Sequence, residues 1–219
     1  GRPFAADSVR VKLGAREAVV VGLATDRLST YRVAVRPSLD LSDPVVWGQQ
    51  NLPALFKDAV LPILLTHTGV KVDRVLLPLV PDGTLFAGAH DHLRFVHRAG
   101  RTVYFHSGSW TEFVSIARLR PTAAGLTWDV AQERITAEDP ADATFAALVR
   151  ETMAKYLTPE ETAVVGHTGG ALGPTDAARF VVEAARRAAG VEAAAIGGTT
   201  FGAGLPAGGV EGGAVDARL

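Results

Sequence analysis

Three histidines lie in two short motifs, and each motif follows an apolar run. His67 stands after residues 61–65, and His90 and His92 stand in a Gly-Ala-His-Asp-His segment after residues 84–87. Imidazoles at the carboxyl ends of neighbouring strands in an α/β sheet lie where such folds bind their ligands. Because neutral imidazole is the commonest side-chain donor for transition metals, the two motifs predict a metal site.

The spacing of His90 and His92 bears on the number of metal ions. One residue separates them, so in extended backbone both side chains face the same way, about 7 Å apart along the strand. Three histidines can hold a zinc-like ion and leave a position for water or substrate. A hydrolytic site with two metals needs more ligands, including a bridging carboxylate. Histidines that are simply hydrogen-bonded at strand ends are the alternative interpretation.

Four other polar residues lie near these motifs in the sequence. We expect His97 and His106 to be surface residues or to support the metal ligands from behind. Asp73 and Asp91 can orient an imidazole by a hydrogen bond, although solvated surface carboxylates are the favoured interpretation. A glycine-rich segment at residues 197–204 is interpreted as a structural turn in preference to an anion-binding loop, because no Gly-Lys-Ser/Thr follows it.

The composition excludes several classes of protein. A hydrophobic content of 47% and a charged content of 21% in 219 residues are typical of a packed globule and argue against disorder. A net charge of −1 removes a broad electrostatic case for nucleic-acid polymers or anionic membranes. The chain has no cysteine, which excludes thiolate ligands and disulfides. No stretch approaches the roughly 18 apolar residues that cross a bilayer, so we expect no membrane insertion.

Hydrophobic periodicity and turn residues predict an α/β chain. We expect strands at residues 8–13, 17–24, 61–66, 84–87, 94–97, 102–106, 112–120, 126–133 and 192–196, with a short strand at 31–35. The pair 94–97 and 102–106 forms a hairpin with a four-residue loop, and the strands 112–120 and 126–133 close the same sheet. We expect helices at residues 45–60, 70–80, 139–156 and 174–189, the first capped by Asp43. A shift in composition places a boundary near residue 136 and divides the chain into domains 1–135 and 136–219.

The order of the motifs is similar to that of a known family. Residues 19–25, 64–69 (with Asp73 following), 88–92, 107–114 and 197–208 resemble, in order, five motifs of the 5′-nucleotidase family of metallophosphoesterases. The resemblance starts after that family's Asn-His-Glu segment. It implies the later part of a calcineurin-like αββα sandwich, followed by the beginning of a 5′-nucleotidase C-terminal α/β domain that binds substrate.

The resemblance also implies a chemistry. In the family, the residues that match His67 and His90 bind one metal and the residue that matches His92 binds the other. It implies two divalent ions, Mn, Zn or similar, and a small-molecule phosphate ester, such as a nucleotide, as substrate. It further implies a periplasmic or extracellular location. It assigns no catalytic residue in this sequence and no oligomeric state.

Two departures from the family pattern shape the expectation. The family's Asp-x-His, bridging Asp and Asn-His-Glu motifs would precede this chain, so we expect the chain by itself to be inactive. Gly197 and Gly202 stand where the family has an Asn and a substrate-holding Arg, so nucleotide specificity does not follow. A thiosulfohydrolase on the same fold, and a non-catalytic remnant or binding module, remain as alternatives.

Overall fold

The chain divides into two compact units, Gly1–Thr136 and Ala137–Leu219. A computed structural model describes residues 6–123, 125–136, 138–197, 204–205 and 207–211. The assignment of the two segments as parts of a catalytic domain and a substrate-binding domain stays a prediction.

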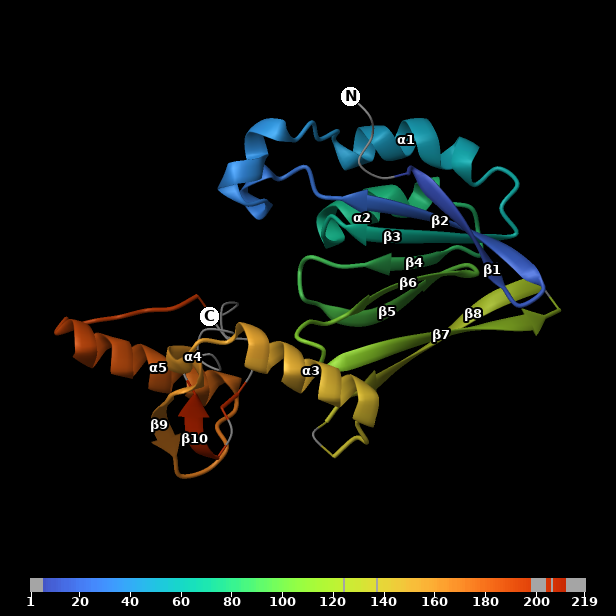
Figure 1. Ribbon diagram of the computed structural model, residues 1–219. Helices are drawn as coiled ribbons and strands as arrows, with labels where there is room; N and C mark the ends of the chain where they lie inside the picture. The colour runs from blue at the N-terminus through green and yellow to red at the C-terminus, as the bar shows by residue number, and fades with distance from the viewer. Residues whose placement is uncertain (1–5, 124, 137, 198–203, 206, 212–219) are drawn as a thin grey trace. The chain divides into compact units, whose positions relative to one another are not determined.

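The first unit is built on a six-stranded sheet (Figure 1). Its strands are β1 (Ser8–Leu13), β2 (Arg16–Ala24), β3 (Leu61–His67), β4 (Leu85–Gly88), β5 (Arg94–Ala99) and β6 (Thr102–Ser107), in the spatial order β1-β2-β3-β4-β6-β5. The four inner strands are parallel, whereas β1 and β5 are antiparallel edges. The sheet is therefore mixed and mostly parallel, in agreement with the predicted α/β class.

Two helices cover one face of this sheet (Figure 1), and local signals position the first. Helix α1 (Pro44–Leu55) begins as predicted, because the Asp43 carboxylate accepts hydrogen bonds from the amides of Val45 and Val46 at 2.7 and 3.1 Å. It ends sooner than residue 60, two residues after Pro53. Helix α2 (Val70–Leu76) continues as a short 3₁₀ turn, Leu77–Leu79, and so ends before residue 80.

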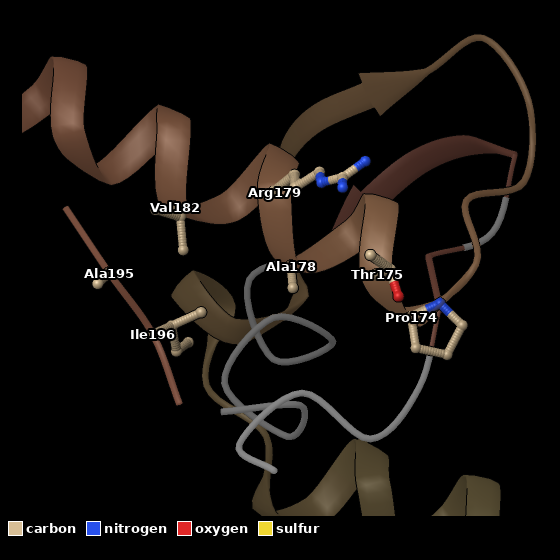
Figure 2. Close-up of a pocket in the computed structure, with 7 residues that line it drawn as sticks. All are labelled: Pro174, Thr175, Ala178, Arg179, Val182, Ala195 and Ile196. Atoms are coloured by element: carbon tan, nitrogen blue, oxygen red, sulfur yellow. The ribbon is translucent and has the colours of Figure 1, made fainter. Parts of the chain in front are cut away.

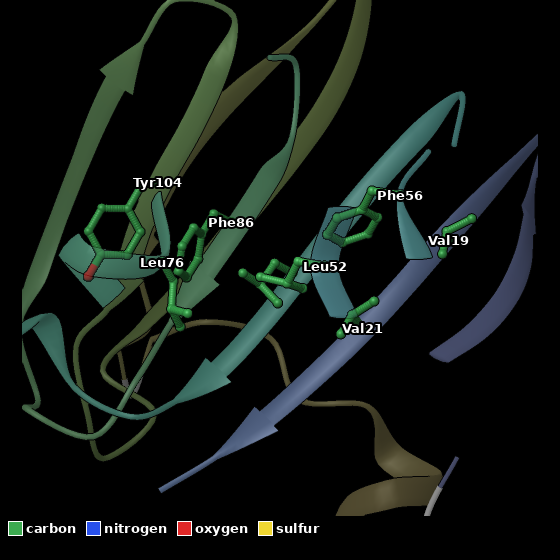
Figure 3. Close-up of a cluster of buried hydrophobic side chains, with 8 residues drawn as sticks. Val19, Val21, Leu52, Phe56, Leu76, Phe86 and Tyr104 are labelled. Atoms are coloured by element: carbon green, nitrogen blue, oxygen red, sulfur yellow. The ribbon is translucent and has the colours of Figure 1, made fainter. Parts of the chain in front are cut away.

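The core between the helices and the sheet follows from strand alternation. Side chains at every second position of the strands point toward α1 and α2, where Leu64 and Phe86 are fully buried (Figure 3). Leu52 of α1 and Leu76 of α2 meet them there. The buried members of this cluster are Val19, Val21, Leu52, Phe56, Leu64, Leu76, Phe86 and Tyr104.

The opposite face of the sheet packs against a second sheet, which corrects one expectation. Strands β7 (Phe113–Thr122) and β8 (Gly125–Arg134) pair only with each other and do not extend the six-stranded sheet. Trp128 of β8 packs against Leu85 and Phe105 of the first sheet, and its indole N–H donates to the carbonyl of Gly83 at 3.1 Å. The first unit therefore has a helix layer, a sheet layer and a second sheet layer, as in the predicted sandwich.

Several predicted elements differ from the structure. The strand expected at residues 31–35 is wrong, because two 3₁₀ turns, Leu28–Thr30 and Val33–Ser38, occupy this region. No strand forms at residues 192–196. The hairpin of β5 and β6 is longer than expected, so its loop has two residues, Gly100 and Arg101, and not four. In each case the prediction used only the hydrophobic pattern of a few neighbouring residues, which does not include tertiary packing.

The second unit contains three helices and a strand pair among its described residues. Its elements are α3 (Ala143–Tyr156), α4 (Pro159–Thr162), β9 (Val164–Thr168), α5 (Pro174–Ala189) and β10 (Gly208–Glu211). Helix α5 ends as predicted at Gly190, which has φ 64°, a conformation that favours glycine. Among the described residues of the whole chain, no helix has the length and apolar character to cross a membrane.

Replacement of Leu52 tests the core of the first unit. Leu52→Ala should lower the free energy of unfolding by about 2–5 kcal/mol, because the side chain is fully buried between α1 and the sheet. Val46→Ala, at a half-exposed position of the same helix, is the matched control and should change it by less than about 0.5 kcal/mol. Urea denaturation measures both. Equal effects in the two variants would contradict this description of the core.

Candidate functional site

The candidate site lies at the carboxyl edge of the parallel strands. His67 is the last residue of β3, and His90 follows β4 by two residues. Their rings meet edge to face, with centroids 5.1 Å apart and an interplanar angle of 79°. His67 is exposed and His90 is half-buried. The two histidines thus come together from different loops and remain accessible to a ligand.

His92 is placed differently from the sequence-based expectation. His90 has φ 95° and His92 has φ 56°, so the segment is a turn and not extended backbone. The expectation of two side chains on the same face of a strand is therefore wrong. The His92 ring packs edge-on against Trp110, with centroids 5.7 Å apart. Trp110 and Thr111 also have positive φ, at 60° and 57°. Positive φ at four non-glycine residues marks the site as locally strained, a feature typical of functional loops.

Asp91 ties the two histidine loops together. Its carboxylate accepts a hydrogen bond from the amide of Val70, the first residue of α2, at 2.6 Å. Gly69 makes this approach possible, because it has φ 86° and a Cβ there would lie 2.9 Å from a carboxylate oxygen of Asp91. Asp91 is exposed, as expected, but it also links the loop after β4 to the loop after β3.

Beneath the histidines lies a carboxylate whose burial the sequence patterns did not predict. Asp73 of α2 is fully buried. One of its oxygens accepts from the hydroxyls of Thr66 and Thr68 at 2.8 and 2.5 Å. The other accepts from the hydroxyl of Tyr104 at 2.9 Å and lies 3.1 Å from Nε2 of His106. Each oxygen of Asp73 therefore has two partners, and the expectation of a solvated surface carboxylate is wrong.

This network fixes the charge of its members. Burial opposes ionisation of Asp73, but the hydrogen bonds from His106, Thr68, Thr66 and Tyr104 outweigh it and hold the pKa of this carboxyl below its usual range. Burial, together with the adjacent charge of Asp73, raises the pKa of the Tyr104 phenol. Asp73 is therefore an anion, and Tyr104 is a neutral donor.

His106 is a buried part of the same network and not a surface residue. It is 1% exposed, and its ring stacks on Phe95 at a centroid distance of 4.9 Å. Nε2 also lies 2.8 Å from the Tyr104 hydroxyl, which donates its own proton to Asp73. These contacts assign the ring proton to Nε2. Nδ1 is buried and has no hydrogen-bond partner in the part of the chain that the structure describes. His97, by contrast, is exposed, as expected.

The buried network explains why a glycine ends β4. A Cβ on Gly88 would overlap the Asp73 carboxylate and the His106 ring. Gly88 pairs with His106 in the register of β4 and β6, and both positions face the helices. The absence of a side chain at Gly88 therefore leaves room for the Asp73 carboxylate and the His106 ring next to the end of β4, two residues before His90.

The described residues bring two of the predicted metal ligands together. His67 and His90 are two nitrogen donors at an accessible edge, which suits a transition metal. Within residues 6–123, 125–136, 138–197, 204–205 and 207–211, however, no group of three or more His, Asp or Glu can hold a metal ion. The histidines alone do not fit a complete one- or two-metal centre, and no catalytic step is assigned to them. The role of His67, His90 and His92 as ligands stays a prediction.

A cavity of about 370 Å³ in the second unit is a separate feature (Figure 2). It lies beside α5, whose Ala178 and Val182 line it together with Ile196. Its charged lining residue, Arg179, forms an ion pair with Asp176 at 3.5 Å. The lining is mainly apolar, so it is better suited to packing against apolar groups than to catalysis. Of the glycine-rich segment 197–208, residues 198–203 and 206, including Gly202, lie outside the described residues.

Comparisons with known proteins find similarity in structure and not in sequence. No protein-family model matches the sequence, and no curated protein does. The sulfate thiohydrolase SoxB of Thermus thermophilus has a TM-score of 0.72 and 17% identity, over 100% of this chain and 42% of that one. A 5′-nucleotidase precursor, also from Thermus thermophilus, has a TM-score of 0.63 and 18% identity, over 97% of this chain and 48% of that one.

A third structure extends this similarity to another organism. A 5′-nucleotidase from Staphylococcus aureus, described as a candidate of that class, has a TM-score of 0.56 and 13% identity, over 97% of this chain and 47% of that one. Identities this low show the fold alone. The chain therefore has the fold of 5′-nucleotidase-type metallophosphoesterases, and the resemblance noted from the motifs is confirmed at that level. The chain spans less than half the length of these three structures.

Replacement of Gly88 tests the close approach of the buried pair. Gly88→Ala should lower the free energy of unfolding by about 1–3 kcal/mol, because the new methyl group overlaps Asp73 and His106. Gly22→Ala in β2 is the control, since nothing lies within 4 Å of a Cβ there. Chemical denaturation measures both, and a Gly88 variant as stable as the Gly22 variant would contradict the geometry.

The pH dependence of stability tests the ionised state of Asp73. Folding lowers the pKa of the Asp73 carboxyl. The ionised carboxylate therefore contributes fully to the free energy of unfolding above the unfolded pKa of about 3.9, and this contribution is lost as the pH falls through the lower folded pKa. Wild-type protein should therefore lose stability below about pH 4. Asp73→Asn should be less stable than wild type at neutral pH, and its free energy of unfolding should fall less than that of wild type as the pH is lowered. Urea denaturation at a series of pH values measures this, and parallel curves for the two proteins would refute it.

Proposed function

We propose that this chain is the later part of a metal-dependent phosphoester hydrolase of the 5′-nucleotidase type. The observation that carries the proposal is the contact of His67 with His90 at the carboxyl edge of the parallel strands. The fold that brings them together is shared, over nearly the whole chain, with two 5′-nucleotidases and a thiohydrolase. Those proteins are hydrolases, which supports a hydrolytic class in general.

The proposed role of this chain's residues is to complete a donor set. His67 and His90 would bind one divalent ion, Mn, Zn or similar, and His92 would bind a second, with the remaining ligands supplied from outside the described residues. Such a metal pair, when bound, activates a water and neutralises phosphoryl oxygens. The chain's own contribution is to orient the imidazoles. Asp91 holds the two loops together through the amide of Val70.

The proposed substrate is a small phosphate ester. Two of the similar structures are named as 5′-nucleotidases, which supports a nucleotide or a related ester. A thiosulfonate ester is the second candidate, because the TM-score of 0.72 against the thiohydrolase exceeds the 0.63 and 0.56 against the nucleotidases. The chemistry of attack at phosphorus and at sulfur makes similar demands on a metal-bound water. A panel containing both classes of ester distinguishes them.

A location outside the cytoplasm accompanies this proposal. One of the similar structures is named as a precursor, which is typical of exported proteins. The periplasm or the extracellular space is therefore the proposed location, and it is tested by fractionation of the source cells.

Replacement of His90 tests the metal role. In the native protein, His90→Ala should remove bound metal and lower hydrolysis of p-nitrophenyl phosphate by at least ~10²-fold, as loss of a principal electrostatic stabiliser would. His67→Ala should act in the same direction. His97→Ala, at an exposed position of β5, is the control and should retain both properties.

Metal content by mass spectrometry and turnover by absorbance measure the outcome. Wild-type metal content and turnover in His90→Ala would overturn the proposal. Wild-type protein that neither binds Mn or Zn nor hydrolyses any ester of the panel would favour the non-catalytic alternative.

A further inference from the structure

We infer that Asp73 is the positioning residue that holds His67 and His90 in place relative to each other. The inference deepens the proposed function and rests on it for the role of the two histidines. Asp73 touches neither ring. It acts through the backbone on both sides of His67 and through the end of the strand that leads to His90.

The first link runs from Asp73 to His67. Thr66 and Thr68 flank this histidine in the sequence, and both hydroxyls donate to the same carboxylate oxygen, at 2.8 and 2.5 Å. Both threonines are buried, at 5% and 8% exposure, whereas His67 is exposed. The carboxylate therefore holds the backbone before and after His67 against α2, while alternation turns the imidazole to the opposite side, toward solvent.

The second link runs from Asp73 toward His90. Its other oxygen receives the hydroxyl of Tyr104 and lies 3.1 Å from Nε2 of His106. His106 pairs with Gly88 across β4 and β6, and the Asp73 carboxylate and the His106 ring lie where a Gly88 side chain would be. Gly88 precedes His90 by two residues. The position of the His90 turn is thus set by the same carboxylate that holds His67.

A purely stabilising role explains this network less well. A buried carboxylate loses its hydration, and apolar groups of similar volume often replace a buried charged network with no loss of stability. The network also leaves Nδ1 of His106 without a partner among the described residues. Four hydrogen-bond donors from β3, the loop after it and β6 fix one arrangement of the loops that carry His67 and His90. An apolar side chain at position 73 would not fix it. Removal of a residue that orients a metal ligand without binding the metal typically lowers metal affinity by about 10–100-fold.

The test separates positioning from stability. The double variant Thr66→Val/Thr68→Val removes the two hydroxyl donors and keeps their shape, so it is less prone to unfold than a change at Asp73 itself. Thr66→Ser/Thr68→Ser keeps the hydroxyls and serves as the conservative rescue. Leu76→Ala is the matched stability control, because Leu76 is fully buried on the same helix and its apolar side chain makes no hydrogen bond to Asp73.

Two readouts are measured on each variant. The first is the nuclear Overhauser effect between the rings of His67 and His90 in metal-free protein. The centroids of these two rings lie 5.1 Å apart. The second is the dissociation constant for Mn²⁺ of the native protein. The valine variant should lose the ring-to-ring signal and bind Mn²⁺ at least ~10-fold more weakly. The serine variant should keep the signal and bind within about threefold of wild type. Leu76→Ala should melt at a lower temperature with the signal retained.

The inference is overturned if the valine variant keeps the signal, or if Leu76→Ala loses it to the same extent. These outcomes do not depend on the proposed function. If wild-type protein binds no Mn²⁺, the proposed metal role fails, but the metal-free spectra still decide whether Asp73 positions the two histidines.

Discussion

A single buried carboxylate constrains the arrangement at the carboxyl edge of the sheet. Asp73 has two oxygens, and donors from β3, the loop after it and β6 converge on them. An unpaired charge in this position would be costly, because burial removes its hydration. The elements that supply the donors must therefore keep their register for Asp73 to remain satisfied. The loops that carry His67 and His90 leave the sheet at the points where this register is fixed.

Strand alternation makes the two faces of the sheet serve different purposes. On one face, Thr66, Gly88 and His106 turn toward the helices and meet Asp73. On the other face, Leu85 and Phe105 pack against the second sheet. His67 continues the pattern at the end of β3 and leaves the buried side. At His67, the buried supporting side chain of Thr66 and the accessible imidazole are thus neighbours along the chain, a consequence of the period of a β-strand.

The proposed hydrolase activity would use the accessible side of this arrangement. The described residues contribute two adjacent imidazoles and a rigid base for them, and they do not complete a metal site. The chain spans less than half the length of each of the three similar solved structures. Asp91 adds a direct tie between the two loops through Val70. In the proposed function, the described residues therefore contribute by positioning the two imidazoles.

Local signals in the sequence determined where several of the elements begin or end. The Asp43 cap of α1, the Gly190 end of α5 and the strand before His67 all follow from interactions within a few residues. Tertiary structure alone decided that Asp73 and His106, 33 positions apart, lie within hydrogen-bonding distance of each other in the buried interior, and that β7 and β8 form their own sheet. It also turned His92 toward Trp110 through positive φ angles that spacing cannot reveal. The physical reason is the sequence separation of the interacting residues. Caps and turns depend on residues a few positions apart, whereas burial and hydrogen-bond pairing depend on which distant strands lie next to each other.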